Sequence, residues 1–133
     1  MKLCVFYISR TGNTKRLAEA IADQFKAPIF DVTTADPAAA NEYDLLIIGT
    51  PVMGMGPAPE VSNFIKRLPD GNGKLVVTFC TYAFAKGGIL KTMEKELSAK
   101  NYKTILGVGK RGIKPGKSDF ADVLDEIAKA VKV

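Results

Sequence analysis

Apolar runs and helical patterns alternate along the whole chain. Apolar segments predict buried strands at 3–8, 45–48, 75–80 and 105–108, and a more mixed segment predicts another at 29–33. Between them, apolar residues recur every three or four positions, as Leu17, Ile21 and Phe25 do, and predict amphipathic helices. Strands that alternate with helices are typical of a parallel sheet with helices on both faces.

The segment at 29–33 differs from the other predicted strands because it contains Asp31 and Thr33. This polarity suits an edge strand and favours the strand order 2-1-3-4-5. In such sheets, ligands bind beyond the carboxyl ends of the strands, at the switch point between strands one and three. We therefore expect the loops at 9–14, 50–57 and 81–88 to meet there.

The first of these loops combines polar side chains with the start of a helix predicted at 13–26. It supplies three hydroxyls, an amide and a glycine that allows a tight turn, in the order Ser9, Arg10, Thr11, Gly12, Asn13 and Thr14. The first N–H groups of the helix point into the loop, and the helix dipole adds partial positive charge. This combination predicts a phosphate site. A simple helix cap is the alternative, although one hydroxyl would be enough for it.

The motif Ser9-x-Thr11-Gly12-Asn13-Thr14, directly after the first strand, resembles the phosphate loop of the flavodoxins. This resemblance, to the short-chain members, implies a flavodoxin-like doubly wound α/β fold with a five-stranded parallel sheet in the order 2-1-3-4-5. It also implies FMN as the cofactor, with its terminal phosphate in this loop.

The second and third loops resemble those that enclose the flavin ring in this family. The second would place Met53 on the inner face of the ring, and the third would place Phe84 or Tyr82 on the outer face. The resemblance also implies that the peptide entering Gly54 can flip, so that its carbonyl accepts a hydrogen bond from N5–H of the half-reduced flavin. Ordinary turn and packing roles are the alternatives for these residues. The implied ring-binding residues are Thr50, Pro51, Val52, Met53, Gly54, Thr81, Tyr82, Ala83 and Phe84.

Composition narrows the function further. The 133 residues predict a single domain over 1–133, without a membrane-spanning run or a signal-peptide pattern, and we expect a cytoplasmic protein. Cys4 and Cys80 lie in predicted strands and suggest reduced core residues. The absence of histidine excludes Ser-His and Cys-His nucleophile pairs.

The net charge of +5 predicts an acidic partner, substrate or surface. The basic residues are scattered, which argues against nucleic acid. Lys86 stands where the family often has an acid, and further cations flank the expected site: Arg10, Lys15, Lys110, Arg111, Lys114 and Lys117. Reduced flavin is an anion in this family. We therefore hypothesise that the reduction potential for forming fully reduced flavin is less negative here than in acidic flavodoxins. Screening of these charges by solvent is the alternative.

Two function classes fit the pattern. The first is an electron carrier, expected to be a monomer that serves redox partner proteins with an acidic docking face. The second is an FMN oxidoreductase that acts on a quinone or another small acceptor. The chain has no inserted lid to enclose a substrate, which favours the carrier. The segment Gly112 to Ser118 resembles a nucleotide-binding loop, but it is one residue short between its glycines and contains Pro115, so we reject that function.

Overall fold

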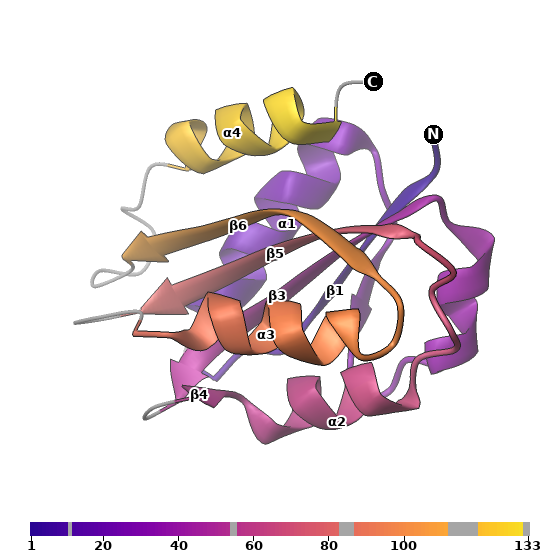
Figure 1. Cartoon of the computed structure of the whole chain (residues 1–133). Helices are drawn as coiled ribbons and strands as arrows, with labels where there is room; N and C mark the ends of the chain where they lie inside the picture. Colours follow the sequence, from indigo (N-terminus) through magenta and orange to yellow (C-terminus); the bar gives the residue numbers. More distant parts are fainter. Residues whose placement is uncertain (11, 54–55, 83–86, 112–119, 132–133) are drawn as a thin grey trace.

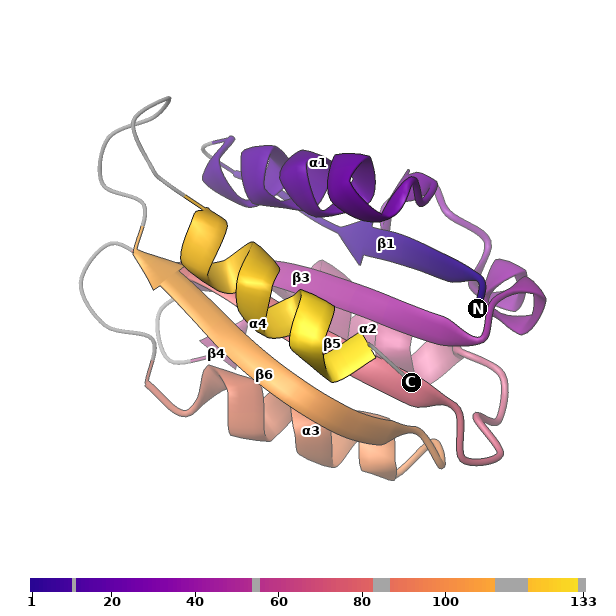
Figure 2. The ribbon, with the colours of Figure 1, turned by 90° about the horizontal axis from the view of Figure 1, so that it is seen from above.

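The computed structural model describes residues 1–10, 12–53, 56–82, 87–111 and 120–131 (Figure 1). A sheet of parallel strands forms the middle layer. Helices α1 (Asn13–Phe25) and α4 (Ala121–Val131) cover one face, and α2 (Pro59–Arg67) and α3 (Ile89–Ser98) cover the other (Figures 1 and 2). The predicted doubly wound α/β fold is confirmed.

The parallel strands follow the predicted order. In space they run β2 (Ile29–Asp31), β1 (Leu3–Tyr7), β3 (Leu45–Met53), β5 (Leu75–Tyr82) and β6 (Lys103–Arg111). The polar strand β2 lies at the edge, as its sequence predicts. An additional two-residue strand, β4 (Gly56–Pro57), pairs antiparallel with the end of β3 and was not predicted.

Alternation along the strands divides the core in two. Phe6 faces α2 and α3 and packs its ring 4.7 Å from that of Phe64. The preceding residue, Val5, belongs to the cluster on the side of α1 and α4. Cys4 and Cys80 are buried thiols that are not joined in a disulfide, and burial raises the pKa of the Cys4 thiol to about 12. Both cysteines are core residues, as predicted.

The central strands are longer than their apolar runs predict. We expected a loop from Gly49 onward because proline is disfavoured in central strands, but β3 continues, and Pro51 pairs with Thr81. The partner on the other side ends earlier, since Tyr7 of β1 lies opposite Gly49. Pro51 therefore lies beyond the end of β1, where β3 has one open side and a missing N–H is tolerated.

Other boundaries shift by a few residues. β2 ends at Asp31 rather than at 33, and β6 spans Lys103–Arg111 rather than the predicted 105–108. The alanine-rich segment between β2 and β3 forms a 3-10 helix, η1 (Pro37–Glu42).

Candidate functional site

Three polar segments meet at the carboxyl edge of the sheet. Tyr7 of β1 pairs with Gly49 of β3, and Pro51 of β3 pairs with Thr81 of β5, so the ends of the three strands are neighbours. The carboxyl ends of β5 and β6 point to the left in Figure 1. The switch-point arrangement predicted from the sequence is therefore present.

In the first loop, backbone N–H groups donate hydrogen bonds to the Ser9 hydroxyl. Gly12 caps α1 with φ of 92°, a left-handed conformation that favours glycine. The Ser9 hydroxyl accepts hydrogen bonds from the N–H groups of Gly12 at 3.0 Å and Lys15 at 3.3 Å. Its oxygen thus serves backbone donors at a helix N-terminus, where a phosphate oxygen is also favoured. This donor set fits the phosphate of FMN. Thr11 lies outside the described residues.

Thr14 links the first loop to the third. Its side chain is 1% exposed, and its Oγ1 lies 2.6 Å from Oγ1 of Thr81 at the end of β5. Either hydroxyl can be the donor. This hydrogen bond fixes the first turn of α1 against β5, which leads directly into the third loop. The sequence predicted that both residues belong to the site, but not that they touch.

The second loop is a β-hairpin. Val52 pairs with Pro57 and Met53 with Gly56, which leaves only 54–55 between the strands. The buried Thr50 hydroxyl donates to the Pro51 carbonyl at 2.9 Å and accepts the Ala58 N–H at 3.0 Å, so it closes the base of the hairpin. A two-residue connection that begins with glycine is a hairpin signal, and this signal was available in the sequence.

The flavin-ring positions are only partly described. Tyr82 is partly buried, ends β5 and pairs with Arg111. Ala83 and Phe84 lie outside the described residues, so the choice of stacking aromatic stays a prediction. Gly54, the Met53 side chain and the predicted peptide flip also lie outside them.

Two of the predicted cations are matched by carboxylates. Arg10 forms an ion pair with Glu60 in the first turn of α2, and its hydrogen bond to that carboxylate lowers the pKa of Glu60. Lys110 Nζ lies 3.0 and 3.2 Å from the two carboxylate oxygens of Asp122, and this contact lowers the pKa of Asp122.

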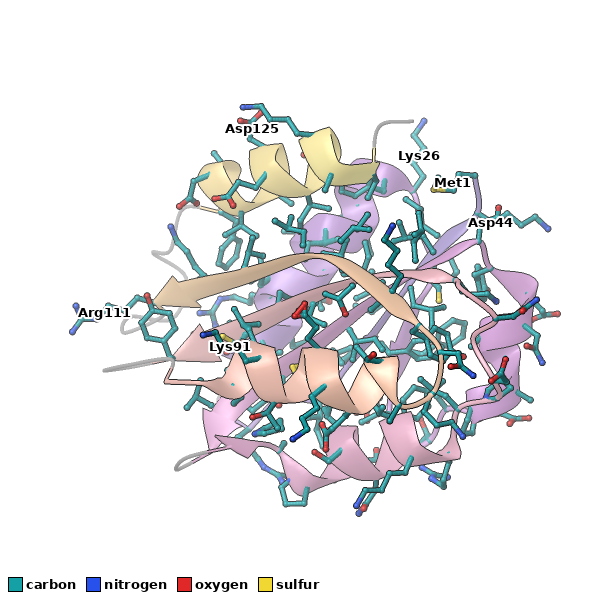
Figure 3. All side chains as sticks on the ribbon, viewed as in Figure 1. Met1, Lys26, Asp44, Lys91, Arg111 and Asp125 are labelled. Carbon is teal, nitrogen blue, oxygen red and sulfur yellow. The ribbon has the colours of Figure 1, made fainter. Side chains whose placement is uncertain are left out.

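Other cations near the carboxyl edge are exposed to solvent. Lys15 and Arg111 are exposed, and Figure 3 shows Arg111 and Lys91 close to the carboxyl ends of β5 and β6. Lys86, Lys114 and Lys117 lie outside the described residues. Neither ion pair was predicted from the sequence, because Glu60 and Asp122 are distant in sequence from the cations that they contact.

Comparisons with known proteins agree with this geometry. Residues 4–109 match the family described as "Flavodoxin domain". The flavodoxin of Nostoc sp. is 32% identical over 115 residues, which cover 78% of this chain and 68% of that protein. Oxidised Flavodoxin 1 from Bacillus cereus superposes with a TM-score of 0.81 at 19% identity, over 98% of this chain and 97% of that chain. Two-electron reduced flavodoxin from Megasphaera elsdenii gives a TM-score of 0.77 at 22% identity, over 96% of each chain.

The chain belongs to the flavodoxin family. Flavodoxins are FMN-binding proteins that transfer electrons to redox partners, and this chain is one of them. The predicted family, cofactor and function are confirmed, and the quinone oxidoreductase alternative is not favoured. Among the described residues, no helix has both the length and the apolar character needed to cross a membrane.

Proposed function

We propose that the three loops of the carboxyl edge hold FMN, within a single domain over 1–133, for electron transfer to a protein partner. The observation that carries this proposal is the hydrogen bond between Thr14 and Thr81, because it joins the phosphate loop to the ring loop. The proposed binding residues are those predicted from the sequence: Ser9, Arg10, Thr11, Gly12, Asn13, Thr14, Thr50, Pro51, Val52, Met53, Gly54, Thr81, Tyr82, Ala83 and Phe84.

The residues of the first loop have distinct roles in this proposal. The backbone N–H groups at the start of α1 bind the phosphate, and the left-handed Gly12 directs them toward it. The Ser9 hydroxyl, which accepts two of these N–H groups, is the group that the phosphate oxygens replace or join. When bound, FMN supplies the one-electron chemistry.

The second and third loops position the ring and exclude water. Thr50 closes the base of the hairpin, so its hydroxyl shapes the loop rather than serving as a direct contact to the ring. The Met53 carbonyl at the hairpin tip is the proposed acceptor for the proton at N5 of the flavin. Tyr82 and Phe84 are the proposed stacking residues.

We also propose an acidic docking face on the partner, and a monomeric, cytoplasmic carrier. Exposed Lys15, Lys91 and Arg111 support the acidic docking face, together with the net charge of +5. Electron exchange with an anionic and with a cationic small redox reagent tests it. Exchange with the anionic reagent should slow as salt is added, whereas exchange with the cationic reagent should become faster. The opposite salt dependence would contradict a cationic docking face.

The central experiment is reconstitution of the protein with FMN, followed by stepwise anaerobic reduction monitored by absorbance. The expected result is uptake of one FMN per chain and accumulation of a one-electron-reduced species between the oxidised and fully reduced spectra. A protein that takes up no FMN would refute the proposed site. Bleaching in a single two-electron step would argue against a one-electron carrier.

Potentiometry during the same titration tests the hypothesis that the reduction potential for forming fully reduced flavin is less negative than in acidic flavodoxins. The exposed cations support this hypothesis because positive charge stabilises the anionic reduced flavin. The ion pairs of Arg10 and Lys110 reduce the expected effect. A lower couple as negative as that of acidic flavodoxins would contradict it.

A further inference from the structure

The ion pair between Arg10 and Glu60 connects two sides of the carboxyl edge. Arg10 belongs to the loop that leads to α1 on one face of the sheet, and Glu60 lies in the first turn of α2 on the other face. The contact uses Nη2 of Arg10 and Oε2 of Glu60. It therefore occupies an arginine of the phosphate loop with a carboxylate of the protein itself.

This ion pair is open to exchange. The two side chains keep 41% and 32% of their surface exposed, and half-exposed pairs contribute little to stability because water and salt compete with them. Arg10 can therefore leave Glu60 at low cost. Its guanidinium carries several N–H donors and binds phosphate in the same forked geometry as carboxylate.

Glu60 is also suited to lose its partner. It lies in the first turn of α2, where the helix dipole favours a negative charge, and it accepts a hydrogen bond from its own backbone N–H. Its second oxygen, Oε1, has no exposed surface and no hydrogen-bond partner among the described residues. The carboxylate is therefore not fully satisfied by Arg10, and the helix terminus continues to stabilise its charge after Arg10 leaves.

We propose that Arg10 is an exchangeable cation, held by Glu60 in the ligand-free protein and transferred to the phosphate of the flavin on binding. This inference rests on the proposed phosphate site at 9–14. A phosphate monoester carries more negative charge than a carboxylate at neutral pH, which favours the transfer. Glu60 then competes with the ligand for Arg10. It lowers the affinity for phosphorylated flavin and leaves the affinity for unphosphorylated flavin unchanged, so it tunes specificity.

The test measures dissociation constants of FMN and riboflavin, which lacks the phosphate, for four apo-proteins: the wild type, Glu60→Gln, Arg10→Gln and the double variant. Glu60→Gln should bind FMN about two- to fivefold more tightly, because a half-exposed ion pair no longer competes. Riboflavin affinity should not change. Arg10→Gln should weaken FMN binding, and adding Glu60→Gln to it should bring no gain.

Glu19→Gln is the matched control. Glu19 is an exposed carboxylate on α1, and its removal changes the net charge by the same amount. FMN affinity should hardly change, because an exposed charge away from the loop is screened. Unfolding midpoints of all variants confirm that each protein is folded during the titration.

Four results would overturn the exchange. If Glu60→Gln increased FMN affinity equally with and without Arg10, the increase would come from the removed negative charge and not from release of Arg10. An equal gain for riboflavin would disconnect it from the phosphate, and weaker FMN binding by Glu60→Gln would mean that Glu60 orients Arg10. A wild type that binds neither flavin refutes the proposed function itself. A wild type that binds FMN well while Glu60→Gln has no effect refutes only this inference.

Discussion

The sheet has an amino edge, where its parallel strands begin, and a carboxyl edge, where they end. Polar groups at these two edges form different kinds of hydrogen bonds and ion pairs. At the amino edge, the Tyr102 hydroxyl donates to the Pro69 carbonyl at 2.7 Å, and Lys74 Nζ donates to the Ala40 carbonyl at 2.7 Å. Asp70 accepts the Asn72 N–H at 3.0 Å within its own turn. These bonds connect turns to each other and close the end of the core.

The carboxyl edge is less complete. Ser9 serves donors at the start of a helix, Arg10 is paired with a half-exposed Glu60, and Glu60 Oε1 has no hydrogen-bond partner among the described residues. Bonds that connect one turn to another contribute stability, whereas an edge with exchangeable bonds can receive a ligand. We therefore expect substitutions at the amino edge to change stability alone, and those at the carboxyl edge to change FMN affinity as well.

The largest effect is expected for Gly71→Ala at the amino edge. A Cβ on Gly71 would lie 2.6 Å from Cγ of Tyr102 and 2.7 Å from the backbone oxygen of Asn101, and neither atom can move freely. The free energy of unfolding should fall by about 2–3 kcal/mol because of overpacking, measured by urea denaturation. FMN affinity of the folded protein should stay unchanged.

Gly88→Ala is the control for this substitution. A Cβ on Gly88 meets no described atom within 4 Å, and its φ of −93° suits any residue. Its stability should stay within about 0.5 kcal/mol of the wild type. A loss of FMN affinity in Gly71→Ala would show that the two edges are coupled.

The next effect concerns the Thr14–Thr81 hydrogen bond at the carboxyl edge. Thr14→Val leaves the Thr81 hydroxyl buried without this partner and should cost about 2 kcal/mol of stability. The double variant with Thr81→Val should recover part of this loss, because both hydroxyls are then removed. FMN titration should show weaker binding in the single and the double variant. Unchanged FMN affinity in both would separate this bond from the site.

A smaller effect is expected for Tyr102→Phe, which loses the bond to Pro69 and about 1 kcal/mol at neutral pH. Burial, and then the charge of Asp70, raises the pKa of Tyr102. Above about pH 10 the unfolded tyrosine ionises while the folded one stays protonated, so wild-type stability falls as the pH rises. The variant should show a shallower fall in urea titrations at alkaline pH.

This alkaline slope should not disappear, because burial also raises the pKa values of Tyr43 and Cys4 and gives the same sign. FMN affinity at neutral pH should match the wild type. An alkaline slope identical to that of the wild type would contradict the role assigned to Tyr102.

The smallest effect concerns a cavity of about 100 Å³ between α3 and the strands β5 and β6. Thr78 lines it, and its Oγ1 is buried without a hydrogen-bond partner among the described residues. Thr78→Val has nearly the same shape, so unfolding should show a gain of less than about 1 kcal/mol. A loss of that size would instead indicate a bound water that bonds to the hydroxyl. Because Thr78 lies at neither edge, the FMN affinity of Thr78→Val gives a baseline for the variants at both edges.

Much of the fold could be read from the chain, and the parts that could not have a common physical cause. Apolar runs mark where a strand is buried on both faces, so they indicated the order and position of the strands but not their ends. Thr50 and Pro51 continue β3 because they pair with β5. A local sequence pattern does not show whether such a neighbouring strand is present. Both ion pairs at the site were missed for the same reason.

Local sequence was enough to indicate the alternation of strands and helices, the edge position of β2 and the phosphate loop at 9–14, because these depend on local chemistry and on neighbours along the chain. The folded chain was needed to show that Thr14 bonds to Thr81, that Thr50 closes the base of the second loop, and that Arg10 is held by Glu60. These contacts join residues that are distant in sequence, and they depend on the order in which the parallel strands place their carboxyl ends side by side.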